Sequence, residues 1–355
     1  MTPSRALVWS VLLGLSCADS RSPVATPAPL QSWSYDSSMV FPADRSLVRP
    51  EDGVRLADGR LIVTDQVSGL REIQPDGQSR PFGQFAAAGY AHQPPAHSGG
   101  ANGVSLEPDG KHVLVADVFG GAIFRVDVAS GATEKLYQHR FGINSVVRDS
   151  RGNVWFTQSA HNTPQEGEAR MWASVDIPKP EGALYRLEMK NDRPVGEAHL
   201  LVDSLFFANG LAIDEKAGRL YLAETVGARV WRFQVDMATG TLSDRAVAVD
   251  SVGADNLEID DAGRLWIAIP LNSEVQVLDP ATGARQTVFS SPSAERAKFL
   301  EEFARRGAAG QSRMELFTPA VWAPLPGLIT GMIPGSGGDP VFLTGLGNAL
   351  LRLPR

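Results

Sequence analysis

One pattern of apolar and polar positions recurs five times along the chain. Each copy is a short strand of alternating apolar residues, a tight turn containing glycine, and a second strand rich in β-branched and aromatic residues. The copies are GVRLADGRLIVTD, GVSLEPDGKHVLVAD, SVVRDSRGNVWFTQ, GLAIDEKAGRLYLAE and NLEIDDAGRLWIAI, and several continue into a third strand such as ARVWRFQVD. The pattern predicts five β-hairpins and an all-β fold.

The spacing of these copies indicates how the hairpins are assembled. The residues just ahead of them lie near 51, 102, 144, 209 and 255, and a sixth, degenerate copy is expected after residue 318. The intervals of 51, 42, 65, 46 and 63 residues suit a four-stranded blade with loops of variable length. A β-sandwich would not explain why the same strand–turn–strand motif recurs along the chain. We therefore predict a six-bladed β-propeller with four-stranded blades over residues 35–355.

The two long intervals contain insertions. One spans residues 158–182, and the other includes residues 293–310, where Ala297, Leu300 and Phe303 recur at helical spacing with Ala304. Either the insertions form a lid near the mouth of an active site, or the helix packs on the rim of the propeller. We favour a position near the mouth, since inserted loops often carry substrate contacts.

The N-terminal residues are typical of an export signal. Arg5 precedes an apolar stretch that is too short to span a bilayer, and the only cysteine of the chain, Cys17, follows directly. The pattern over 1–17 predicts a bacterial lipoprotein signal with lipidation of Cys17, with an ordinary secretory signal as the alternative. Residues 18–34 read as a flexible linker. We expect an exported protein, either periplasmic or anchored to the outer membrane, with secretion as the alternative.

Composition narrows the class of partner. The chain has 355 residues, is 43% hydrophobic and 21% charged, and carries a net charge of −7. These values are ordinary for a globular protein, and no basic stripe favours nucleic acid. We expect a small-molecule partner, no nucleic acid, and membrane contact only through the N-terminal lipid.

Oxygen-bearing side chains stand at the start of each repeat. In a propeller the innermost strands line the central channel, so equivalent starting residues converge near one end of the axis. One such asparagine would be an ordinary turn residue. Five successive blades with Asp, Glu or Asn at this place are harder to explain as turn chemistry; the residues are Glu51 with Asp52, Asn102, Asn144, Asn209, and Asp255 with Asn256.

Converging carboxylates repel one another unless they are protonated or bind a cation. Carboxylate and amide oxygens suit a hard cation, and calcium accepts 6–8 of them in flexible geometry. We therefore predict Ca²⁺, with Mg²⁺, Mn²⁺ or Zn²⁺ as alternatives if waters complete a smaller set of ligands.

Four motifs resemble those of a known superfamily. They are PEDG at 50–53, NS at 144–145, FANGLAID at 207–214 and DNLEID at 255–260. The set is similar to the calcium-dependent six-bladed propellers, which comprise the gluconolactonase and senescence-marker group, the paraoxonases and the strictosidine-synthase-like proteins. The resemblance covers residues from about 50 to 280 and extends more loosely to the C-terminus.

Carried over by position, the resemblance implies a set of metal ligands: Glu51, Asn144, Asn209, Asp255 and Asn256. It also implies that Asn144 is either a ligand or a substrate contact, and we expect Asn102 to contact substrate as well. Two positions depart from the paraoxonase pattern. Asn102 replaces a histidine that is the suggested base, and Ser145 replaces an aspartate of a second calcium site, which leaves both the base and a second metal open.

The sequence-based hypothesis is a metal-dependent hydrolase of lactones or related esters. Asp255 is the first candidate for the catalytic base, with His161 and His97 as second candidates because both lie in loops that could reach the mouth. Each histidine is equally compatible with a solvated loop position. The alternatives are a non-catalytic or sugar-binding propeller with a structural metal and, less favoured, a strictosidine-synthase-like enzyme.

Overall fold

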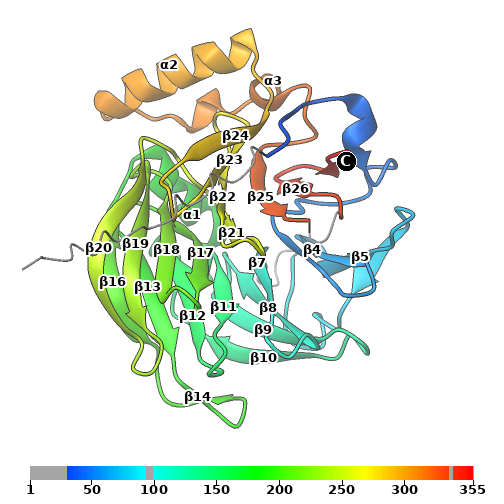
Figure 1. Cartoon of the computed structure of the whole chain (residues 1–355), viewed down its shortest axis with the longest axis vertical. Coiled ribbons are helices and arrows are strands. Elements are labelled where there is room, and N and C mark those ends of the chain that lie inside the picture. The colour runs from blue at the N-terminus through cyan, green and yellow to red at the C-terminus, as the bar shows by residue number, and fades with distance from the viewer. Residues whose placement is uncertain (1–29, 93–98, 336–338, 355) are drawn as a thin grey trace, which may run out of the picture.

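Six β-sheets are arranged around a central axis, as the computed structural model shows (Figure 1). The structure describes residues 30–92, 99–335 and 339–354. The predicted signal over 1–17, with Cys17, lies outside the described residues. The sheets follow one another in chain order around the wheel, so the predicted six-bladed propeller is confirmed.

Each blade is an antiparallel meander that starts at the axis and ends at the rim. Blade 1 consists of β3 (Gly53–Arg55), β4 (Leu61–Asp65), β5 (Gly69–Ile73) and β6 (Ser79–Phe82). Blade 2 consists of β7 (Ala101–Leu106), β8 (His112–Asp117), β9 (Ala122–Asp127) and β10 (Thr133–Gln138). Blade 3 consists of β11 (Val146–Arg148), β12 (Val154–Gln158), β13 (Gly182–Leu187) and β16 (His199–Leu205), with the hairpin β14 (Met189–Lys190) and β15 (Arg193–Pro194) between its last two strands.

The second half of the wheel repeats this plan. Blade 4 consists of β17 (Ala208–Asp214), β18 (Arg219–Glu224), β19 (Arg229–Asp236) and β20 (Thr241–Asp250). Blade 5 consists of β21 (Leu257–Ile259), β22 (Leu265–Ile269), β23 (Glu274–Leu278) and β24 (Arg285–Ser290). Blade 6 consists of β25 (Ile329–Ile333), β26 (Phe342–Gly345) and β27 (Leu350–Arg352).

Strands from the N-terminal segment complete the last two blades. β2 (Val40–Phe41), which follows the short helix η1 (Ser37–Met39), pairs antiparallel with β27 and supplies the fourth strand of blade 6. β1 (Trp33–Ser34) pairs in parallel with β24 at the edge of blade 5. The linker predicted over 18–34 therefore ends too late, because residues 33 and 34 already belong to the sheet.

The sixth blade does not begin where the repeat spacing placed it. Residue 318 precedes the short helix α3 (Pro319–Trp322), and the innermost strand of blade 6 starts only at Ile329. In that blade Thr330 stands near the axis, where the other blades carry Asp, Glu or Asn. Because the threonine side chain has no carboxylate or amide, the start of the sixth repeat could not be recognised from the sequence.

The blades are joined at the axis by hydrogen bonds that pass from each blade to the next. The N–H groups of Gly103, Gly210 and Asn256 donate to the carbonyl oxygens of Asn144, Asp255 and Thr330, respectively. Side chains complete the circle: Asp52 Oδ2 accepts from Val104 N–H, Thr157 Oγ1 donates to the Asn209 carbonyl, and Thr330 Oγ1 donates to the Glu51 carbonyl. This circle holds the starts of the innermost strands close together.

Gly210 is required because two strands approach closely at this point. A Cβ atom at this position would lie 2.5 Å from the carbonyl oxygen of Asp255. We expect Gly210→Ala to lower the free energy of unfolding by about 1–3 kcal/mol, as overpacking does. Urea denaturation measures the change. Gly253→Ala is the control, since its nearest atom would be 3.3 Å away; equal stability of the two variants would contradict the close approach.

Both insertions form helices. α1 (Gly167–Asp176) lies within residues 158–182, and α2 (Ala294–Ala308) confirms the helix expected over 293–310. Met171 and Val175 of α1 pack with Phe207 and with Met314 of the short helix η2 (Met314–Leu316). α2 lies outside the sheets in the view of Figure 1, beside α3. None of the helices in the described part of the chain is long and apolar enough to cross a bilayer.

Candidate metal centre and substrate cavity

One cavity of about 200 Å³ lies at the end of the axis where the innermost strands start. Five of the oxygen-bearing residues singled out in the sequence line it, namely Glu51, Asn102, Asn144, Asn209 and Asp255. They come from the first five blades, and all five are buried. The fold thus brings together residues that are up to two hundred positions apart in the chain.

Three oxygen atoms in this cavity have no hydrogen-bond partner among the described residues. They are Glu51 Oε2, Asn209 Oδ1 and Asp255 Oδ1, and each is shielded from solvent. A buried polar atom without a partner costs free energy, and a native structure usually satisfies it. These three oxygens come from three blades and share one cavity. A hard cation that bound all three as ligands would satisfy them.

Glu51 is held in place by its neighbours while one of its oxygens stays available. Asn256 Nδ2 donates to Glu51 Oε1 over 3.1 Å, and the Thr330 and Thr344 hydroxyls donate to the Glu51 carbonyl. Burial, followed by the charges of Asp255 and Asp52, raises the pKa of the Glu51 carboxyl well above its usual range. A bound divalent cation would favour the charged form and offset this shift.

Asp255 shares this environment. Burial raises the pKa of its carboxyl to about 7, and the adjacent Asn209 side chain and the Arg49 charge oppose the rise. The Asn209 amide is oriented by Thr225, since Nδ2 donates to Thr225 Oγ1 over 3.0 Å. The orientation leaves Asn209 Oδ1 free to face the cavity together with the carboxylate.

Asn102 and Asn144 form a pair in the same cavity. Asn102 Nδ2 donates to Asn144 Oδ1 over 3.2 Å, so both amides are engaged. Arg49, which the sequence analysis missed, donates from Nη2 to Asn102 Oδ1 over 3.3 Å. Its guanidinium lies 5.1 Å from the centre of the Phe119 ring, and its Nη1 is buried without a partner among the described residues.

No sequence signal singled out Arg49, because it precedes the first repeat. Its backbone adopts a left-handed conformation with φ of 54°. Its position two residues before Glu51 becomes informative only when the cavity is known. It places one positive charge among the carboxylates. In the described structure its guanidinium donates a hydrogen bond to the Asn102 amide and forms no ion pair.

Two other predicted residues lie outside the lining of the cavity. Asn256 is buried but acts through Glu51. His161 is exposed, and its ring stacks on Phe141 with 4.6 Å between the ring centres. The structure therefore does not bring His161 to the candidate site, because the 158–182 insertion turns it outward. His97 lies outside the described residues.

Asp52 is not directed into the cavity. Its Oδ1 accepts from Gly53 N–H over 2.8 Å, and its Oδ2 accepts from Val104 N–H over 2.9 Å. Burial raises the pKa of this carboxyl to about 7. Both oxygens are engaged by backbone N–H groups, and Oδ2 joins blade 1 to blade 2, which supports a structural role.

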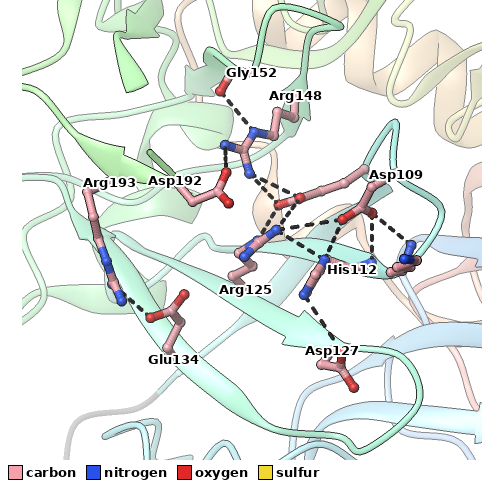
Figure 2. A network of polar contacts seen from close by, with 11 residues as sticks. Asp109, His112, Arg125, Asp127, Glu134, Arg148, Gly152, Asp192 and Arg193 are labelled. Atoms are coloured by element: carbon pink, nitrogen blue, oxygen red, sulfur yellow. Dashed lines mark hydrogen bonds and ion pairs between the residues drawn. The ribbon is translucent and has the colours of Figure 1, made fainter. Parts of the chain in front are cut away.

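A second group of acidic residues does not fit a cation. Glu107, Asp109 and His112 lie close enough together to hold a metal, but both Glu107 oxygens accept hydrogen bonds from Arg125 and Arg148. Figure 2 shows Arg125 and Arg148, the two arginines whose guanidinium groups donate to Glu107. A cation there would face two fixed positive charges, so the cluster is an ion-pair network.

The donors in the cavity fit calcium better than a softer metal. The described lining residues include carboxylate, amide and hydroxyl oxygens, and none of these residues is a histidine or cysteine. Oxygen donors of mixed charge in flexible geometry are the ligands that Ca²⁺ prefers, whereas Zn²⁺ prefers nitrogen and sulfur. Glu51, Asn209 and Asp255 would hold the ion, with Asn144 beside them.

The hydrogen bond from Asn256 to Glu51 gives a test of this geometry. We expect Asn256→Ala to weaken Ca²⁺ binding about 10–100-fold, because residues that orient a ligand contribute this much to metal affinity. Isothermal titration calorimetry measures the affinity. His161→Ala serves as the control and should leave it unchanged; equal affinities for Asn256→Ala and wild type would show that Glu51 needs no such support.

Comparison with known proteins identifies the group to which this chain is similar. Residues 132–298 match the family described as SMP-30/Gluconolactonase/LRE-like region. A gluconolactonase from Xanthomonas campestris superposes with a TM-score of 0.58 at 18% identity over 87% of each chain. The resemblance to this propeller superfamily is confirmed. The calcium-binding protein regucalcin from Agrobacterium tumefaciens superposes with a TM-score of 0.54 at 17% identity over 75% of this chain and 81% of its own.

Curated relatives align over shorter regions. A pentonolactonase of Haloferax volcanii is 25% identical over 183 residues, which are 50% of this chain and 55% of the relative. The adipocyte plasma membrane-associated protein hemomucin of Drosophila melanogaster is 26% identical over 181 residues, which are 47% of this chain and 29% of the relative. The chain thus spans about half or less of the length of these relatives.

Proposed function

We propose that this protein is a metal-dependent hydrolase of lactones or related esters, with Ca²⁺ as the metal. The observation that carries the proposal is the set of three unpartnered, buried oxygens of Glu51, Asn209 and Asp255 in one cavity. The similarity to a gluconolactonase and a pentonolactonase supports the substrate class. Metal-assisted ester hydrolysis needs an oxygen-lined site of this kind at the base of a cavity.

When bound, the metal would supply Lewis-acid polarisation of the substrate carbonyl and stabilise negative charge on its oxygen. The residues of the chain supply the rest. Water adds across the acyl C–O bond: the acyl carbon gains a hydroxyl group, and the leaving oxygen gains a proton. Asp255 is our candidate to accept the proton of that water, because it is the carboxylate that lies in the cavity beside Asn209.

Arg49 and Asn102 are positioned to orient the substrate. The Arg49 Nη1 atom is an unused donor near the carboxylates, and it can donate a hydrogen bond to an oxygen of the ligand. The amide of Asn102 is fixed between Arg49 and Asn144, which gives this side of the cavity a defined geometry. A general base is most effective when the substrate is held in this way.

A non-catalytic propeller that binds a small ligand is the second candidate. It is favoured by one observation: none of the described lining residues is a histidine, the residue most often used as a base. In that case the metal would be structural, and no substrate would be consumed.

The test is hydrolysis of a panel of γ- and δ-lactones and aryl esters by the purified protein with and without a chelator. We expect activity that is lost on chelation and restored by added Ca²⁺. We also expect Ca²⁺ at about 100 times its Kd to stabilise the chelated protein by about 2.7 kcal/mol, because only the folded state offers the site. Hydrolysis that chelation leaves unchanged would overturn the proposal, and Ca²⁺ binding without hydrolysis would support the second candidate.

A further inference from the structure

The cavity has a polar base and apolar walls. The base is formed by Glu51, Asn102, Asn144, Asn209 and Asp255, which we call the oxygen ring. The walls come from loops and insertions: Met171 and Val175 of α1, Phe207 before β17, Val226 and Leu271 in turns of blades 4 and 5, and Phe317 after η2. We call these six residues the apolar chamber. They come from separate segments of the chain, and Met171, Val175 and Phe207 also pack together in one hydrophobic cluster.

The polar side chains beside the apolar chamber are already engaged. Arg313 Nη2 donates to the Val175 carbonyl over 2.5 Å, and its guanidinium lies 4.2 Å from the centre of the Phe303 ring. Thr225 Oγ1 donates to the Ala254 carbonyl over 2.7 Å and accepts from Asn209. These contacts leave few hydrogen-bonding partners on the described walls above the oxygen ring.

This distribution of polar groups discriminates between two kinds of lactone. A sugar lactone carries several hydroxyl groups, and each hydroxyl that is buried without a partner lowers affinity. An alkyl or aryl substituent gains from burial against Met171, Val226 and Leu271 instead. Both kinds of lactone present the same carbonyl group to the oxygen ring, so the walls decide between them.

We infer that the substrate is a lactone or ester with an apolar alkyl or aryl substituent, which occupies the apolar chamber while its carbonyl faces Glu51, Asn209 and Asp255. Polyhydroxylated sugar lactones are poor substrates of this site. The inference rests on the proposed hydrolase function, but the chamber makes a separate prediction about binding. Its ligand preference is opposite to the sugar-lactone preference that the names gluconolactonase and pentonolactonase indicate for the two similar proteins.

The first measurement is kcat/KM for γ-lactones of increasing side-chain length, from γ-butyrolactone to γ-nonalactone, beside glucono-1,5-lactone. We expect kcat/KM to rise roughly fourfold for each added methylene until the chamber is filled, as burial of one methylene predicts. Glucono-1,5-lactone should be at least about tenfold poorer than γ-nonalactone. A flat series, or a preference for glucono-1,5-lactone, would overturn the inference while leaving the hydrolase proposal intact.

The second measurement uses variants of two chamber residues that are only partly buried. Val226 and Leu271 are half-buried turn residues, so Val226→Asn and Leu271→Asn should fold. We expect each to lower kcat/KM for γ-nonalactone about tenfold and to reduce the dependence on side-chain length. Leu200→Asn is the matched control, since Leu200 is 52% exposed on blade 3 and outside the cavity lining. A loss of equal size in the control variant would contradict a specific role of the chamber.

The third measurement separates the two proposals when hydrolysis is absent. Lactams resist hydrolysis, so calorimetry can compare a γ-lactam bearing a pentyl group with gluconolactam. Tighter binding of the pentyl lactam without hydrolysis of any ester would support the apolar chamber and refute the hydrolase. Equal or tighter binding of gluconolactam would overturn the chamber inference, whatever the protein hydrolyses.

Discussion

Asp255→Asn is expected to lower kcat/KM for lactone hydrolysis about 10²–10⁴-fold, the range for loss of a general base. The substitution keeps the shape of the side chain but removes its negative charge. It also replaces one of the three unpartnered oxygens that would hold the cation with an amide. We therefore expect weaker Ca²⁺ binding together with the loss of activity, measured by calorimetry and by lactone hydrolysis on the same preparation.

The stability of the metal-free protein distinguishes a specific effect of Asp255→Asn from a general folding defect. Without a cation, the charges of Glu51 and Asp255 oppose each other in a buried site, since the Asp255 charge raises the pKa of Glu51. Chelated Asp255→Asn should thus be at least as stable as the chelated wild type in urea denaturation. Asp203→Asn, at an exposed position on β16, is the control for activity. An inactive variant that is also much less stable under chelation would point to misfolding.

Glu107→Gln is expected to cost about 3–5 kcal/mol of unfolding free energy, the range for removing one partner of a buried ion pair. Glu107 is 3% exposed and accepts hydrogen bonds from Arg125 and Arg148. Arg148 is also held by Asp192 and by the Gly152 carbonyl, so it cannot turn away to solvent without losing these contacts (Figure 2). Removal of the central carboxylate leaves two guanidinium groups close together in the interior.

A second ion pair in the same region provides the matched control. Glu134 accepts from Arg193 over 2.8 Å, but the two side chains are 39% and 68% exposed (Figure 2). We expect Glu134→Gln to change the unfolding free energy by no more than about 1 kcal/mol, as exposed pairs do. Urea denaturation of both variants measures the difference. A similar small effect for both would show that the Glu107 network contributes little to stability.

The sequence predicted the features that depend only on residues close together in the chain. A strand–turn–strand motif is formed by neighbouring residues alone, so five of the six blades could be recognised from their alternating apolar positions. The oxygen ring was recognisable for the same reason, because Asn209 and its equivalents stand at the same place in each phrase. The helix over Ala294–Ala308 followed from apolar residues at helical spacing.

Other features had no local signature. The start of the sixth blade was misplaced because Thr330 replaces the expected carboxylate or amide. His161 was a reasonable candidate from its loop, but the stacking on Phe141 that turns it away from the cavity involves a contact outside its own segment. Arg49 was missed because its role depends on Asn102 and Phe119, which belong to the next blade.

The sequence by itself determined the repeated strands and the kind of atom at the start of each repeat, because both depend on short-range spacing. Only the tertiary structure decided which oxygens remain without partners, which acidic cluster is neutralised by arginines, and that apolar insertions cover the oxygen ring. These properties arise when the wheel closes and distant segments share one cavity. Their energies come from burial and from the pairing of charges across blades, which no single repeat contains.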